Sequence, residues 1–220
     1  EQVAAGGPGL DLEPGIAAAF KPLELRPPRL RYLAFNALRA PLDDADVRHA
    51  LAVLVNRREI EKRVFDGLAR PALWPIWPGG FVNGAEPAVP DFDPAQASKL
   101  LDAAGWTDTD KDGIRDRAGV QLRLVMIGGE KPAQKDAAGP PTTIVRDYFI
   151  EAARRIGVVI EVKTGGESWI ENRIQEGTYD IAELVWTGMV DMDVSSRLKH
   201  PQRAASPRID HVLDQMRAAW

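Results

Sequence analysis

The sequence of 220 residues predicts an α/β fold, with a mixed and largely parallel sheet flanked by helices. The first indication is that strand and helix patterns alternate from residue 120 to residue 186. Strands joined through a helix pair in parallel by right-handed crossovers. The second indication is a hydrophobic content of 45%, which is enough to bury a core of one or two domains.

The first third of the chain predicts a lead-in, a strand and two helices. Residues 1–28 contain Gly-Gly-Pro-Gly, Pro-Gly and Pro-Pro steps and predict an irregular segment. Residues 32–35 form a short aromatic and aliphatic run, typical of a strand. A helix follows, because apolar residues recur at helical spacing: Val47, Ala50, Leu51, Leu54 and Val55. Asn56, with Glu59 three residues later, caps a second helix that ends at Gly67.

Residues 70–92 predict a long loop, because five prolines interrupt every periodic pattern there. Long loops inside compact domains are commonly functional, and this one carries Trp74 and Trp77. Asp93 followed by Pro94 then predicts a capped helix that ends at Gly105.

The remainder predicts alternating strands and helices. Residues 120–127 alternate apolar side chains on one side, namely Val120, Leu122, Leu124 and Met126. A helix at 143–156, a strand at 158–163 and a strand at 179–186 follow along the chain. Ser168 and Glu171 match a capping box that opens a helix ending at Gly177. Ser206 and Pro207 predict the start of a last helix.

Composition excludes several classes of function. The net charge is −4 with both signs spread along the chain, so no basic patch for nucleic acid is expected. Cysteine is absent, which excludes disulfides, thiolate nucleophiles and thiolate metal sites. No apolar stretch approaches the ~20 residues that span a bilayer.

An acidic loop matches part of a calcium-binding loop. Asp108, Asp110 and Asp112 stand at positions 1, 3 and 5, a glycine follows at position 6, and Asp116 falls at position 9. Position 12, which needs a bidentate glutamate, is Gly119. The pattern therefore favours a polar turn, with a calcium site as the alternative. We expect no metal and no cofactor.

Candidate ligand-binding residues gather around the end of the last predicted strand. Trp186 ends this strand, and Asp191 and Asp193 follow it, where open α/β sheets bind ligands. The aromatic rings of Trp74 and Trp77 add amphipathic surface from the proline-rich loop. Two alternatives remain open, a hydrolase or lyase domain that uses Asp191 or Asp193 and a calcium-stabilised interaction module. Neither a nucleophile elbow nor a matched set of acids supports catalysis.

Several motifs, in order along the chain, resemble one known family. These are the run from Tyr32 through Asn36 to Gly67, the run from Asp93 to Trp106 with the acidic loop after it, and Gly177-Thr-Tyr-Asp180 leading to Trp186. A weaker match is the tail from Ser206 to Leu213. Together they resemble the family 5 extracytoplasmic solute-binding proteins of ABC transporters, which include dipeptide-, oligopeptide- and nickel-binding members.

The resemblance implies a fold, a location and partners. Residues 29–220 would form the C-terminal, periplasmic-binding-protein-like (type II) lobe of a two-lobe protein whose N-terminal lobe is absent. The function implied is capture of a small, peptide-like solute and its delivery to an ABC permease in the membrane. We expect a periplasmic (extracytoplasmic) monomer that is not an enzyme and binds no nucleic acid.

The resemblance also implies ligand contacts, with one departure. Peptide-binding members resemble Trp-x-x-Asp at the end of this strand, where the aspartate pairs with the ligand's α-ammonium. The matching position here is Met189, and a thioether cannot balance a buried ammonium. Either Asp191 takes over this role, or the ligand has no free amine at this point. We favour the second, and expect Trp186, Met189, Asp191, Asp193, Trp74 and Trp77 to contact ligand.

Overall fold

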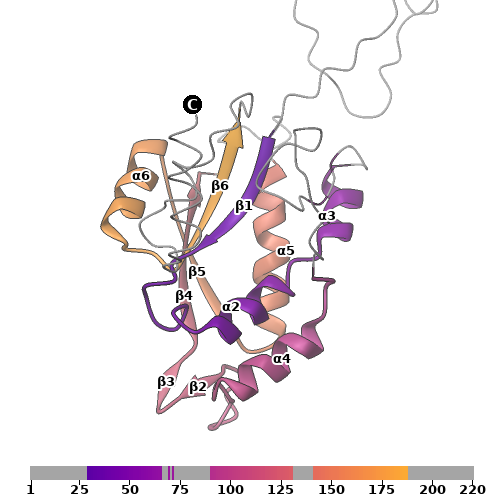
Figure 1. Cartoon of the computed structure of the whole chain (residues 1–220), viewed down its shortest axis with the longest axis vertical. Coiled ribbons are helices and arrows are strands. Elements are labelled where there is room, and N and C mark those ends of the chain that lie inside the picture. Colours follow the sequence, from indigo (N-terminus) through magenta and orange to yellow (C-terminus); the bar gives the residue numbers. More distant parts are fainter. Residues whose placement is uncertain (1–28, 66–68, 70, 72–89, 131–140, 188–220) are drawn as a thin grey trace, which may run out of the picture.

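The computed structural model describes residues 29–65, 69, 71, 90–130 and 141–187, and every structural statement below refers to these residues. They form a four-stranded sheet with the order β1-β6-β4-β5 and a separate two-stranded ribbon of β2 and β3 (Figure 1). No described helix has both the length and the apolar character needed to cross a membrane. The lead-in at 1–28 and the last expected helix lie outside the described residues.

The second half of the described chain alternates strand and helix, as the sequence predicts. β4 (Arg123–Gly129) is followed by α5 (Pro141–Arg155), β5 (Val159–Gly165), α6 (Glu167–Glu176) and β6 (Ile181–Thr187). β4 pairs in parallel with both β5 and β6, while β1 (Arg29–Phe35) joins the free side of β6 antiparallel. The expected fold class, a mixed and largely parallel sheet flanked by helices, is confirmed.

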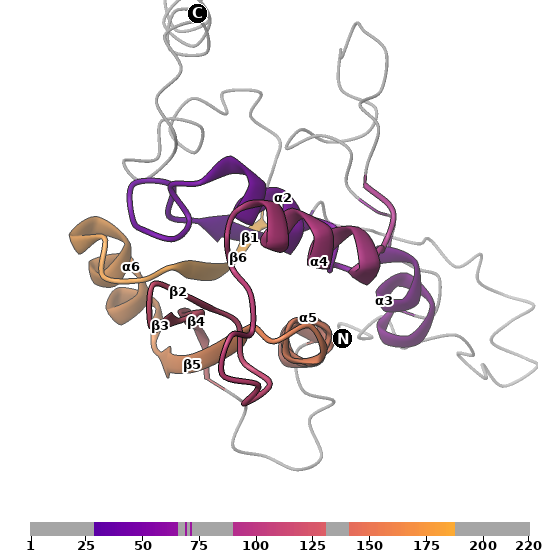
Figure 2. The ribbon, with the colours of Figure 1, turned by 90° about the horizontal axis from the view of Figure 1, so that it is seen from below.

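Helices cover the two faces of the sheet unequally. The main core joins α2 (Ala45–Ala52), α4 (Pro94–Ala103) and α5 to one face of the sheet, and α3 (Arg57–Val64) packs against α5. A smaller core joins α6 to the opposite face through Tyr179, Ile127 and Ala182. Figure 2 shows α6 standing apart from α2, α4 and α5.

The helices begin where capping chemistry satisfies their free amides. The side chains of Asp44, Asn56 and Asp93 accept hydrogen bonds from the first turns of α2, α3 and α4. The predicted capping box at Ser168 is wrong. α6 begins after Gly166, whose missing side chain offers no cap, so Ser168 lies inside the first turn.

The strand predicted at 120–127 is two elements rather than one. β2 (Asp116–Arg117) and β3 (Val120–Gln121) form a ribbon, and β4 begins after Leu122. Leu122, Leu124 and Met126 are buried as expected, but Val120 is 64% exposed. Ala118 and Gly119 connect β2 to β3 with positive φ at both positions, the conformation of a type I′ hairpin turn. Val120 belongs to this ribbon and not to the core.

Candidate functional site

Four strand ends meet at one edge of the sheet. The carboxyl ends of β4 and β5 lie together, since Gly129 is paired with Gly165, and the carboxyl end of β6 meets the start of β1, since Thr187 is paired with Arg29. From β4 the chain goes to β5 on one side and then to β6 on the other, by helices on opposite faces. The junction of β4 and β6 is therefore a topological switch point, where open α/β sheets bind ligands.

Trp186 lies at this edge, as the sequence predicts, with its backbone paired with that of Leu30. The other predicted ligand contacts, Met189, Asp191, Asp193, Trp74 and Trp77, lie outside the described residues. The convergence of these residues into one binding site therefore stays a prediction.

The sheet is split at the switch point. Pairing between β4 and β6 stops at Ile127 with Ala182, although β4–β5 pairing continues to Gly129 and β1–β6 pairing to Thr187. We call this unpaired region, Gly128–Gly129 of β4 and the part of β6 from Glu183 onward, the strand split. It opens at the carboxyl edge.

A buried ion pair bridges the strand split. One Arg146 nitrogen, Nη1, lies 3.4 Å from Oε2 of Glu183 and 3.4 Å from the carbonyl oxygen of Gly129. The side chains of Arg146 and Glu183 are 2% and 8% exposed. Gly128 makes room for them, because a Cβ there would lie 2.8 Å from Glu183 Oε2 and 3.1 Å from Arg146 Nη1.

Burial dominates the electrostatics of Glu183. Desolvation raises the pKa of this carboxyl above its usual value, the positive charges of Arg146 and Arg31 work against that rise, and the negative charge of Asp147 adds to it. Sequence reasoning missed this pair. The available signal was a charged residue on the apolar face of each element. Arg146 precedes buried Phe149 by three residues on α5, and Glu183 follows buried Ile181 by two residues on β6, so each pair shares a face.

The opposite edge of the sheet is closed by hydrogen bonds. The Asn36 side chain donates to the carbonyl oxygens of Gly177 and Tyr179, at 3.1 and 3.0 Å. Buried Asp180 accepts from the amide of Val125 at 2.6 Å and pairs with Arg39 at 2.9 Å. The hydrogen bonds and the ion pair of these side chains are therefore made within the fold.

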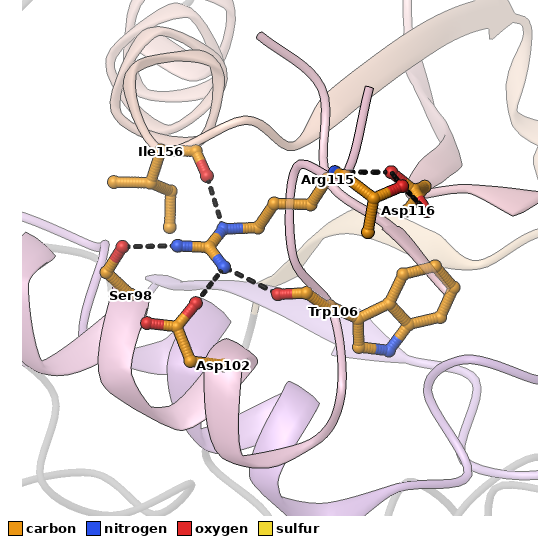
Figure 3. A network of polar contacts seen from close by, with 7 residues as sticks. Ser98, Asp102, Trp106, Arg115, Asp116 and Ile156 are labelled. Atoms are coloured by element: carbon orange, nitrogen blue, oxygen red, sulfur yellow. Dashed lines mark hydrogen bonds and ion pairs between the residues drawn. The ribbon is translucent and has the colours of Figure 1, made fainter. Parts of the chain in front are cut away.

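Arg115 forms a second structural network, shown in Figure 3. Its guanidinium donates to the carbonyl oxygens of Ile156 and Trp106 and to the side chains of Asp102 and Ser98. These partners come from α4, from the chain after it and from the residue that follows α5. The network joins three segments and engages all three nitrogens of this guanidinium.

The acidic loop brings together only part of the predicted calcium set. Carboxylate oxygens of Asp108, Asp110 and Asp116 lie within 4.8 Å of one another. Asp112 instead accepts from the Gln121 side chain and the Ile114 amide. Asp116, 7% exposed, accepts from the amide and the hydroxyl of Thr109. These bonds support the polar turn, and the calcium alternative stays untested.

Comparisons with known proteins agree on one family. The family model described as bacterial extracellular solute-binding proteins, family 5 Middle, matches residues 6–202. "Oligopeptide-binding protein OppA" of Lactococcus lactis subsp. lactis is 29% identical over 68% of this chain, and "Protein XP55" of Streptomyces lividans is 28% identical over 94% of it. The chain spans only 25% and 39% of the lengths of these two relatives.

A solved structure shows the same fold. The oligopeptide-binding protein AppA from Bacillus subtilis, in complex with a nonapeptide, superimposes with a TM-score of 0.73 at 19% identity. The match covers 86% of this chain and 38% of that protein. The expectation of a type II binding-protein fold is thereby confirmed.

Proposed function

The chain belongs to family 5 of the bacterial extracellular solute-binding proteins, and on that premise we propose that it forms one wall of a cleft that captures a small, peptide-like solute. The observation that carries the proposal is the family match over residues 6–202. In the proposed mechanism two lobes close around the solute by a hinge motion, and the closed protein delivers it to an ABC permease. The proposed location is the periplasm.

The carboxyl edge is the proposed position of this wall. The strand ends meet there at the switch point, and Trp186 lies at the end of β6. In this proposal the segment from Met189 to Asp193 extends the rim beyond β6, and Trp74 and Trp77 contribute aromatic surface from the loop. Related proteins are named for oligopeptide binding, which supports a peptide-like solute.

A solute without a free amine near Met189 is the proposed preference. An ammonium buried against a thioether would cost several kcal/mol, whereas a polarizable methionine suits an apolar group. N-acetylated peptides should then bind at least as tightly as unmodified ones, and Asp191→Asn should change the affinity little.

The test uses the chain itself with two defined probes, tri-alanine and N-acetyl-tri-alanine, followed by NMR at millimolar concentrations. We expect saturable shifts of the amides at the ends of β4 and β6, weakened about fivefold by Trp186→Ala. Phe92→Ala, at an exposed aromatic next to α4, is the matched control and should leave the shifts unchanged. Tighter binding of the free amine, abolished by Asp191→Asn, would instead assign the ammonium to Asp191. Shifts scattered away from the carboxyl edge would contradict the proposed wall.

A further inference from the structure

The strand split contains a guanidinium that makes few hydrogen bonds with the described residues. Both contacts of Arg146 use the same nitrogen, Nη1, and both are 3.4 Å long. Charge-assisted hydrogen bonds between nitrogen and oxygen are ordinarily about 2.7–2.9 Å. Among the described residues Arg146 Nε has no hydrogen-bond partner, although it is buried. A buried polar group without a partner is uncommon in folded proteins, and a binding role is one explanation for it.

The charge around the split favours an anion. Arg146 and Arg31 both act on Glu183, so two guanidinium groups surround one buried carboxylate. Asp147 is the third charged group that acts on this carboxyl, and it is exposed, so water screens its charge more strongly. Arg146 is therefore a buried cation at the split that still has an N–H donor without a partner among the described residues. In a water-poor site this charge acts strongly on a group that enters.

The backbone leaves the approach to Arg146 free of side chains on β4. Gly128 and Gly129 form the β4 side of the split, and no atom of the described residues lies within 4 Å of the position where a Cβ on Gly129 would be. The split opens at the switch point, where ligands of open α/β sheets bind. The side of Gly129 is therefore the direction from which a small planar group can approach the split.

We propose that the strand split is a subsite for a carboxylate of the solute, with Arg146 as the residue that binds it and Glu183 as the residue that positions Arg146. This inference rests on the proposed function and adds the chemical class of the group that this wall recognises. The carboxylate accepts from the free Nε and from a terminal nitrogen, the bidentate geometry that arginine offers. The guanidinium of Arg146, which has donors and no acceptor, would also disfavour an ammonium here.

The experiment titrates the chain with sodium acetate and follows Arg146 Nε–H and the amides of Gly128 and Gly129 by NMR. Sodium chloride keeps the ionic strength constant, because screening alone changes exposed charges. We expect saturable shifts of all three signals with acetate and none with methylammonium chloride. Arg146→Met should weaken acetate binding about tenfold or more. Arg154→Met, at an exposed arginine on the same helix, should not change it.

The direct Arg146 Nε–H signal keeps the test valid if Arg146→Met does not fold. Equal shifts with acetate and chloride, or acetate shifts that leave Arg146 Nε–H unmoved, would overturn the subsite. A stronger response to methylammonium would assign the split to a cation and would also overturn it. Acetate binding without any response to tri-alanine supports the subsite and contradicts the peptide-like solute. Tri-alanine binding without acetate binding would support the peptide-like solute and overturn the subsite.

Discussion

At the scale of single residues, the motifs that carry the family resemblance consist largely of side chains that satisfy the fold. Asn36 and Asp180 close one edge of the sheet, and Arg115 joins three segments. Each donates to or accepts from backbone groups that would otherwise be buried without partners. These residues identify the fold and say little about the solute. Of the buried ion pair, Arg146 lies outside the motifs, and Glu183 lies within the last one, between Asp180 and Trp186.

Replacing Arg115 should destabilise the protein, because the hydrogen bonds that it donates are lost. Arg115→Met leaves the carbonyl oxygens of Ile156 and Trp106 without their donor, and we expect a loss of about 3 kcal/mol. Urea denaturation measures it as a lower midpoint at unchanged slope. Arg123→Met, at an exposed arginine bonded to Gln121, is the control and should change stability by less than about 0.5 kcal/mol. Equal effects of the two substitutions would show that the network is not stabilising.

Two adjacent glycines should respond differently to alanine. A Cβ on Gly128 meets Glu183 Oε2 and Arg146 Nη1, so Gly128→Ala should cost about 1–3 kcal/mol. The added methyl of Gly129→Ala meets none of the described residues within 4 Å, so this change should be neutral or stabilise by about 0.4–1 kcal/mol. The melting temperatures of the two variants test this comparison. An unchanged melting temperature for Gly128→Ala would show that the ion pair can move to make room for the methyl group.

Glu183 should make stability fall as pH rises. Its pKa is raised in the folded protein, so the folded state binds the proton more tightly than the unfolded state does. The favourable contribution is complete below about pH 4.3, the ordinary value for glutamate, and is lost as pH rises through the folded value. Relative to Glu183→Gln, wild-type stability should therefore decrease from pH 4 towards neutral. Glu151, whose pKa is lowered to about 2 by hydrogen bonds from Arg154 and Arg155, provides the control with the opposite sign.

At the scale of elements, the sequence predicts the order of helices and strands well and their exact limits less well. Helix caps at Asn56 and Asp93 and the alternation from β4 to β6 are readable because each depends on near neighbours in the sequence. The β2–β3 ribbon was missed, because Val120 continues the apolar alternation of β4 although it pairs elsewhere. The strand split was not predictable, since it depends on where pairing between distant strands stops.

The acidic loop should not respond to calcium. Gly119, at the position that a calcium loop gives to a glutamate, adopts positive φ in the turn between β2 and β3. Adding calcium or magnesium chloride should leave the melting temperature nearly unchanged. A true site at a hundredfold excess over its dissociation constant would add about 2.7 kcal/mol. A higher melting temperature with calcium but not with magnesium would contradict the polar turn and favour the calcium site.

At the scale of the whole molecule, the described residues provide one wall of the proposed cleft. Clefts of this kind bury most of a ligand's surface only when both walls are present. Much of the entropic cost of capture remains when one wall is removed. We therefore expect this chain alone to bind peptide pools more weakly than micromolar in calorimetric titrations. Micromolar binding would show that the chain contains a complete site.

The antiparallel pairing of β1 with β6 also has a consequence for how the chain folds. The hydrogen bond from Asn36 to Gly177 joins residues 141 positions apart, and the β1–β6 ladder beside it closes a loop of similar length. Contacts this distant in sequence slow folding, because the chain must lose loop entropy before the contact forms. β1 is synthesised well before β6, its pairing partner among the described strands. Completion of this sheet is therefore a late event, and until then β1 is an open edge that other chains can join.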